Sequence, residues 1–167
     1  QVIVSARQSR CHSISYTYTE PTIFFEYAYQ TAKLAHAADM KNIFVTNGYM
    51  TPETLDSIQP YLDAANVDLK AFSNDFYKEQ CGAKLAPVLE SLQKLKSMGV
   101  WLEVTTWVIP SFNDSDRELT EIAQFIAELG PETPWHVSRF HPTYKLKNTS
   151  STPVATLKRA REIGVQV

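Results

Sequence analysis

Apolar, β-rich runs alternate with helix-patterned segments along the whole chain, and this alternation constrains the fold more than any other feature. Residues 101–109 are apolar along nearly their full length, which is typical of a parallel strand buried on both faces. Parallel strands require long crossovers, and helices usually supply them. The sequence therefore predicts an α/β fold in which helices cover a parallel sheet.

The predicted elements follow one another as strand and helix. Two architectures fit such repeated units, an open doubly wound sheet and a full or partial (β/α) barrel, and the periodicity does not choose between them. The chain lacks the glycine motifs GxGxxG and GxxxxGK(S/T), so the usual nucleotide-binding reasons for an open sheet are absent. The predicted strands are 12–18, 42–46, 65–69, 101–109, 135–140 and the start of one at 164–167, and the predicted helices are 22–38, 52–61, 84–98, 115–129 and 153–163.

Capping signals support several of the predicted helix starts. A threonine before a proline provides a cap residue and a first helical position at which a missing N–H costs nothing. A serine followed three residues later by a glutamate predicts a capping box. These signals are Thr51-Pro52, Thr152-Pro153 and Ser115 with Glu118.

Composition excludes several classes of partner. The 167 residues are 44% hydrophobic and 20% charged, which suits one globular domain. Sixteen basic and 18 acidic residues leave a net charge of −2 without a basic block, so we expect no nucleic-acid partner. No apolar stretch is long enough to span a bilayer and no signal peptide is visible, so we expect no membrane partner and a cytoplasmic location.

The two cysteines and the two ends of the chain give further expectations. Cys11 and Cys81 are too few for a disulfide scaffold, and we expect them to be small buried hydrophobic residues. The chain begins with Gln1 rather than Met and ends on an apolar run that resembles the start of a strand. We therefore expect a fragment that is truncated at both ends.

Polar residues follow each predicted strand, at the sheet edge where α/β proteins bind ligands. Each group also has a simpler interpretation. Glu20 and Thr19 would cap the helix near Pro21, Asn47-Gly48 would form a turn, Asp68 and Lys70 would form an ion pair, and His141 would lie in a surface loop. Their occurrence together favours a binding site. The segments are Tyr18-Thr19-Glu20-Pro21, Thr46-Asn47-Gly48-Tyr49, Asp68-Leu69-Lys70, residues 109–114 and residues 138–142.

These segments in this order resemble the radical S-adenosylmethionine (SAM) enzymes related to the pyruvate formate-lyase activating enzyme. Residues 13–21 (SISYTYTEP) and 135–142 (WHVSRFHP) resemble, more narrowly, the AmmeMemoRadiSam-system radical SAM proteins. The similarity extends over nearly the whole chain. It implies a partial (β/α) barrel of the radical SAM type, with residues 1–167 as a single radical SAM core domain.

The resemblance also implies a role for each strand-end segment. Residues 17–21 replace a glycine-rich segment whose main chain binds the amino group of SAM, so Tyr18, Thr19 and Glu20 would lie there. The carboxylate and ribose of SAM would lie near the two segments that follow. Ile109 would pack near adenine, and His141 would approach the nucleoside. The segments near the carboxylate and ribose contain Thr46, Asn47, Asp68 and Lys70.

One family feature is missing from the sequence. Radical SAM enzymes hold a [4Fe–4S] cluster through three cysteines, usually CxxxCxxC, and this chain has no such motif. The resemblance places residues 1–10 at the end of the helix that follows the cluster loop. The [4Fe–4S] cluster would therefore belong to the intact protein, and its ligand cysteines are absent from this chain.

The resemblance implies reductive cleavage of SAM to a 5′-deoxyadenosyl radical that abstracts hydrogen from an unknown protein or small-molecule substrate. An electron donor such as flavodoxin or ferredoxin would be a partner, and the fragment itself would be inactive. Two alternatives remain, an aldolase-like barrel in which Lys70 forms a Schiff base and a degenerate barrel that serves as an interaction module. Residues that could line a substrate site, or simply pack, are Trp107, Phe112, Arg139 and Tyr144.

Overall fold

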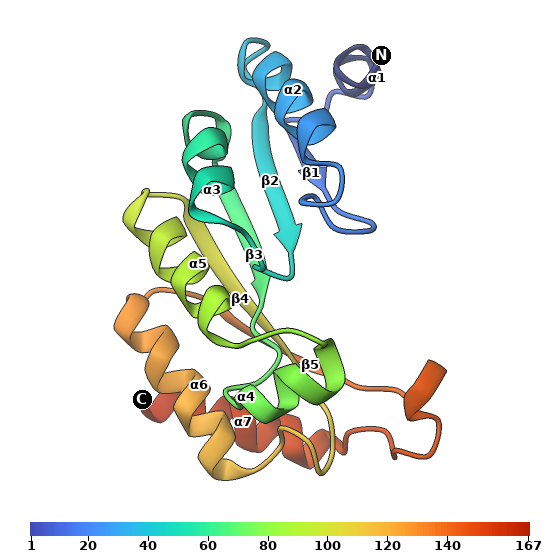
Figure 1. Ribbon diagram of the computed structural model, residues 1–167, viewed down its shortest axis with the longest axis vertical. Coiled ribbons are helices and arrows are strands. Elements are labelled where there is room, and N and C mark those ends of the chain that lie inside the picture. Colours follow the sequence, from blue (N-terminus) through green and yellow to red (C-terminus); the bar gives the residue numbers. More distant parts are fainter. The chain divides into compact units, whose positions relative to one another are not determined.

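Strands and helices alternate along the chain in the computed structural model, which describes residues 1–167 (Figure 1). The strand order is β1-β2-β3-β4-β5, which confirms the predicted α/β class. None of the helices has the length and apolar character needed to cross a lipid bilayer. The strands are β1 (Ser13–Tyr16), β2 (Lys41–Thr46), β3 (Ala64–Asp68), β4 (Trp101–Val108) and β5 (Trp135–Arg139). The helices are α1 (Val2–Gln8), α2 (Phe25–His36), α3 (Pro52–Ile58), α4 (Asn74–Phe76), α5 (Ala86–Ser97), α6 (Asp116–Leu129) and α7 (Val154–Gln166), with short turns of helix η1 (Gln59–Tyr61), η2 (Tyr77–Cys81) and η3 (Tyr144–Leu146).

The chain folds as two compact units. The first unit comprises Gln1–Val67 and Pro87–Leu102, and the second comprises Asp68–Ala86 and Glu103–Val167. The first contains β1, β2 and most of β3, and the second contains most of β4 and all of β5. The helix α1 falls where the resemblance expects the end of a helix.

In the first unit, β1, β2 and β3 pair in parallel, and α2 packs on β1 and β2. Along β2, burial alternates, with Asn42, Phe44 and Thr46 buried, because successive side chains of a strand point to opposite faces. Fully burying one large apolar side chain contributes roughly 1.5–3 kcal/mol. Side chains less than 2% exposed in this core include Phe44, Leu55, Ile58, Val67, Val88, Leu92 and Leu95.

In the second unit, β4 and β5 pair in parallel from Val104 with Trp135 to Val108 with Arg139. Helices α6 and α7 lie side by side, and α7 also packs on β5 (Figure 1). A cluster of buried side chains joins these elements. It contains Val108, Leu119 and Ala160, with Trp135, Val137, Leu157 and Ile163 packed against it.

Two of the predicted caps form. The hydroxyl of Thr51 accepts the Thr54 N–H at 3.3 Å and Pro52 follows it, as predicted. The hydroxyl of Ser115 accepts the Glu118 N–H at 3.2 Å. The second half of the predicted capping box is wrong, because Glu118 Oε1 accepts the Phe72 N–H at 2.5 Å instead. The Glu118 side chain therefore links α6 to the segment after β3.

Thr152 is not the cap of α7, contrary to the prediction. Pro153 occupies the cap position and no side chain caps this helix. Thr152 is fully buried, and its hydroxyl donates to the Val108 carbonyl at 2.5 Å and accepts the Phe140 N–H at 3.0 Å. Because the hydroxyl is already hydrogen-bonded to the last residue of β4 and to the residue after β5, it does not cap the helix.

The predicted strand start at 164–167 is also wrong, because α7 continues to Gln166. Gly164 does not end the helix. A Cβ at this position would lie 2.9 Å from Trp135 Cε3, so the glycine permits close contact between α7 and the indole ring. The apolar run at the end of the sequence belongs to a helix whose last residues, such as Val165, are exposed.

The expectation that the cysteines are buried is wrong as well. Cys11 and Cys81 are both exposed and neither forms a disulfide. Cys11 follows α1, and Cys81 ends η2. Neither residue lies in a strand or in one of the long helices that pack into the core.

Candidate functional site

Glu20 joins the segment after β1 to the end of β2. Its side chain is buried, Oε1 accepts the Thr46 hydroxyl at 2.6 Å, and Oε2 accepts the Asn47 N–H at 2.8 Å. Thr22 adds longer contacts to Oε1 from its N–H at 3.4 Å and its hydroxyl at 3.2 Å. The structure thus brings together Glu20, Thr46 and Asn47, three of the residues that the sequence singled out.

The simpler interpretation of Glu20 as a helix cap is wrong. Helix α2 begins at Phe25 with Phe24 as its cap residue, and no side chain caps it. A turn precedes the helix, in which the Ile23 N–H donates to the Glu20 carbonyl at 3.0 Å. The turn separates the carboxylate from the helix start and leaves it to bond the end of β2.

The Asn47-Gly48 turn forms as predicted. Asn47 Oδ1 accepts the Tyr49 N–H at 2.8 Å, and Gly48 adopts a φ of +73°. A Cβ on Gly48 would lie 2.7 Å from Val67 Cγ1, so both the backbone angle and the packing against β3 require glycine. The turn and the Glu20 contacts together fix the main chain at the end of β2.

Tyr18 and Thr19 occupy the segment that precedes Glu20. Tyr18 is 93% exposed, Thr19 is exposed, and the peptide bond between them is cis. The segment is therefore accessible at the point where the buried Glu20 carboxylate anchors it.

In the second unit, Asp68 and Lys70 form an ion pair with Lys70 Nζ 2.9 Å from Asp68 Oδ2. Both side chains are partly exposed, whereas Leu69 between them is fully buried. This division follows the alternation of side chains along a strand. The predicted ion pair is confirmed, and it presents a carboxylate and an ammonium group together at the end of β3.

The main chain after β3 is held by side chains from elsewhere in the second unit. The Thr106 hydroxyl donates to the Leu69 carbonyl at 2.8 Å, and Asn113 Nδ2 donates to the Lys70 carbonyl at 2.6 Å. The Lys70 N–H donates to the Tyr77 hydroxyl at 3.1 Å. Lys70 is thus held through its N–H, its carbonyl and its ammonium group.

Ile109 and His141 complete the predicted set. Ile109 is buried, and its N–H donates to Asn113 Oδ1 at 2.6 Å. His141 is exposed in the segment after β5, as its simpler interpretation predicts. Ile109 and Lys70 both form a main-chain hydrogen bond with the Asn113 side chain, whereas His141 is hydrogen-bonded to none of the other predicted residues.

Sequence reasoning did not single out Asn113 or Tyr77. Asn113 lies in the quoted segment 109–114, and an asparagine shortly after a strand is a signal for side-chain bonds to nearby main chain. Tyr77 gave no such signal, because an aromatic residue in a loop is equally compatible with simple packing.

Burial shifts two pKa values near Lys70. Tyr77 is 2% exposed, and burial raises the pKa of its hydroxyl well above its ordinary value, so the group stays neutral. Burial likewise raises the pKa of the Cys81 thiol, and the charge of Lys70 opposes this shift. Neutral Tyr77 accepts the Lys70 N–H without adding charge beside the Asp68–Lys70 pair.

The cysteines do not fit a [4Fe–4S] cluster. Such clusters are held by cysteine thiolates, three of them in the radical SAM proteins that this sequence resembles. The chain has two cysteines, one in each unit, and no group of three or more His, Cys, Asp or Glu side chains is arranged to hold a metal ion. The residues of this chain therefore do not supply the cluster site.

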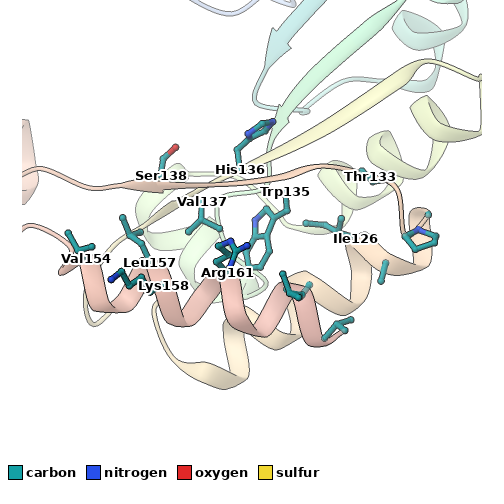
Figure 2. A pocket seen from close by; sticks show the side chains of 17 residues that line it. Ile126, Thr133, Trp135, His136, Val137, Ser138, Val154, Leu157, Lys158 and Arg161 are labelled. Atoms are coloured by element: carbon teal, nitrogen blue, oxygen red, sulfur yellow. The ribbon is translucent and has the colours of Figure 1, made fainter.

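A pocket of about 980 Å³ lies beside β5 in the second unit. Figure 2 shows Trp135 and Val137 pointing toward α7 and His136 and Ser138 pointing away from it. Arg161 of α7 also lines the pocket. Its lining includes Ser138, the first residue of the strand-end segment 138–142, but none of the candidate SAM-binding residues, so the pocket is separate from the candidate site.

The fold and the residues that follow the strands define an α/β protein with polar groups at the carboxyl ends of parallel strands. The family model of the radical SAM superfamily matches residues 1–126. The chain belongs to the radical SAM superfamily.

The similarity to one curated relative extends beyond residues 1–126 to nearly the whole chain. The chain is 43% identical over 167 residues to an uncharacterized protein, MJ0808, of Methanocaldococcus jannaschii, covering 99% of this chain and 49% of the relative. It is 31% identical over 87 residues to the isethionate sulfite-lyase activating enzyme of Nitratidesulfovibrio vulgaris, covering 51% of this chain and 28% of that enzyme. The chain thus spans about half or less of the length of these relatives.

Solved structures share the fold at low sequence identity. A domain of a pyruvate-formate lyase-activating enzyme from Bacteroides vulgatus superposes with a TM-score of 0.74 at 13% identity, covering 92% of this chain and 93% of that domain. Streptococcus suis SuiB bound to S-adenosylmethionine superposes with a TM-score of 0.67 at 15% identity, covering 86% of this chain and 33% of SuiB. These likenesses confirm the predicted fold, a partial barrel of the radical SAM type.

Proposed function

We propose that the protein containing this chain is a radical SAM enzyme that cleaves SAM reductively and passes a hydrogen-abstracting radical to its substrate. The match of the superfamily model to residues 1–126 carries this proposal, because that region includes every predicted site residue except His141. Relatives named as activating enzymes favour a related hydrogen abstraction. The same proposal has three further parts. The protein would be of the narrower AmmeMemoRadiSam type, residues 1–167 would form one core domain, and flavodoxin or ferredoxin would be the electron donor.

The contacts described above suit the polar part of SAM. The main chain of the exposed residues Tyr18 and Thr19 would bind its amino group, while the buried Glu20 carboxylate keeps that segment in place through Thr46 and Asn47. Thr46 is buried and bonded to Glu20, so its contribution would be to position the main chain.

In the second unit, the Asp68–Lys70 pair would face the carboxylate and ribose of SAM, since an ammonium group and a carboxylate complement these groups. The apolar side chain of Ile109 would contact adenine, and the exposed His141 would approach the nucleoside. Bound with a cluster, SAM supplies the radical chemistry, and the protein supplies binding and orientation. Because Cys11 and Cys81 do not form the cluster site, we assign its thiolates to residues outside this chain.

The test uses the full-length protein that contains this chain, reconstituted with iron and sulfide without oxygen. After reduction, we expect conversion of SAM to 5′-deoxyadenosine and methionine, measured by chromatography. Asp68→Ala and His141→Ala should weaken SAM binding while leaving iron content unchanged, because neither side chain is a thiolate ligand. Cys11→Ser and Cys81→Ser should also leave iron content unchanged, and iron loss in either would contradict the ligand assignment.

Two other outcomes distinguish the alternatives. Assembly of a cluster without SAM cleavage would favour an interaction module. Covalent capture of a carbonyl compound by borohydride, lost in Lys70→Arg, would favour the aldolase-like alternative, because only a lysine amine forms the Schiff base that borohydride reduces. The radical SAM proposal predicts no capture at Lys70.

A further inference from the structure

We propose that Asn113 is a positioning residue that orients Lys70, and with it the Asp68–Lys70 pair, at the end of β3. The inference rests on the proposed function, in which this pair faces SAM. Asn113 is 1% exposed, and its side-chain hydrogen bonds all go to main-chain groups. It therefore acts on the site through the backbone of other residues.

The asparagine side chain has the donors and acceptor that this position needs. Its Nδ2 group donates to the Lys70 carbonyl at 2.6 Å and to the Trp107 carbonyl at 2.9 Å, and its Oδ1 accepts the Ile109 N–H at 2.6 Å. A carboxamide alone among side chains of this size combines two N–H donors with an acceptor. Asn113 thereby connects Lys70, the second residue after β3, to Trp107 and Ile109 at the end of β4.

The position of Lys70 depends on such side-chain contacts. Strand β3 ends at Asp68, and the next two carbonyls, of Leu69 and Lys70, accept bonds from Thr106 and Asn113. The Lys70 N–H is likewise bonded to a side chain, the Tyr77 hydroxyl. Losing the Asn113 donor would release one of the two main-chain attachments of Lys70.

The variant Asn113→Asp isolates this function. The substitution keeps the size of the side chain and an oxygen that accepts the Ile109 N–H, but an ionised carboxylate has no donor for the carbonyls of Lys70 and Trp107. Amide hydrogen exchange should accelerate at least tenfold at Lys70 and stay unchanged at Ile109. Asn113→Ala should accelerate exchange at both residues.

Asn42→Asp is the matched control. Asn42 is also fully buried and makes the same kinds of contacts, donating to the carbonyls of Ala32 and Tyr61 and accepting the Tyr16 hydroxyl. It lies near the start of β2, among residues of the first unit. We expect a comparable loss of thermal stability without a selective change in exchange at Lys70.

SAM itself is the binding probe, titrated into the reconstituted full-length protein that contains this chain and followed by isothermal titration calorimetry. We expect Asn113→Asp to weaken binding at least tenfold and Asn42→Asp to change it less than twofold. Equal effects of the two variants on Lys70 exchange or on SAM affinity would overturn the proposal. Loosening of Lys70 with unchanged SAM affinity would also overturn it.

The two proposals fail differently. If the wild-type full-length protein fails to bind SAM, the proposed function is wrong, while amide exchange at Lys70 in the ligand-free protein still decides whether Asn113 orients Lys70. If Asn113→Asp does not fold, Tyr77→Phe tests the other attachment, because it removes the acceptor of the Lys70 N–H and retains the ring. Unchanged Lys70 exchange and SAM affinity in Tyr77→Phe would then overturn the inference.

Discussion

The Thr46 hydroxyl lies 2.6 Å from Glu20 Oε1, although 26 residues separate the two in sequence. The bond connects the segment after β1 to the last residue of β2, and the second carboxylate oxygen accepts the Asn47 N–H. A buried carboxylate is retained when it has donors of this kind. Glu20 is therefore a structural anchor of the proposed SAM-binding segment.

Glu20→Gln should lower the free energy of unfolding by about 2 kcal/mol. The amide NH2 group would face either the Thr46 hydroxyl or the Asn47 N–H, which are both donors to Glu20, and the charge-assisted hydrogen bonds would be lost. Urea unfolding measures the change. The exposed Glu26→Gln is the control and should change stability by less than about 0.5 kcal/mol. Equal stability of the two variants would show that the carboxylate does not anchor the segment.

Gly48→Ala should destabilise the protein more than Gly82→Ala. Both glycines have positive φ angles, +73° and +63°, but a Cβ at Gly82 meets nothing within 4 Å whereas one at Gly48 lies 2.7 Å from Val67 Cγ1. The backbone angle alone costs about 1 kcal/mol, and overpacking adds roughly 1–3 kcal/mol at Gly48. Urea unfolding of both variants separates the two contributions, and equal losses would contradict the predicted clash.

Ser111→Gly should stabilise the protein by up to about 1 kcal/mol. Ser111 has a φ of +67°, a conformation that costs a residue with a side chain about 1–2 kcal/mol more than glycine, while glycine raises the entropy of the unfolded chain. The Ser111 N–H that donates to Asp114 Oδ1 is retained. Thermal unfolding is the measurement, with the helical Ser97→Gly as a control that should be destabilised.

Stability near Glu118 should depend on pH. Burial raises the pKa of this carboxyl in the folded protein, so its stabilising contribution is fully present below the ordinary glutamate pKa and declines as pH rises through the raised value. Relative to Glu118→Gln, the wild type should therefore gain stability as the pH is lowered from about 7.5 to about 5. Urea unfolding at both pH values checks the sign, and a relative loss at the lower pH would contradict it.

The strands were predictable because their apolar runs and their end signals agree. The predicted strand 101–109, for example, differs from β4 by one residue at its end. Local patterns did not reveal which partner a polar group chooses. Thr152 and Glu118 have the spacing of helix caps, yet Thr152 bonds Val108 and Glu118 bonds Phe72, because in each case a main-chain group distant in sequence lies within hydrogen-bond distance.

The same limit applies to the candidate site. The Asp68–Lys70 pair follows from strand alternation and is confirmed. The bond between Glu20 and Thr46, and the contacts of Asn113, join segments whose proximity depends on sheet register and loop path. The sequence pattern does not indicate which of these segments lie close together. Residues such as Glu20 and Thr46 could therefore be singled out, but the hydrogen bond between them could not be predicted.

The exposed cysteines give the protein a native pair of labelling positions. Cys11 belongs to the first unit and Cys81 to the second, and both residues are exposed and form no disulfide. Nitroxide spin labels attached to the two would report the distance distribution between the units by pulsed electron paramagnetic resonance, without an engineered substitution. Repeating the measurement with SAM would show whether the ligand narrows that distribution.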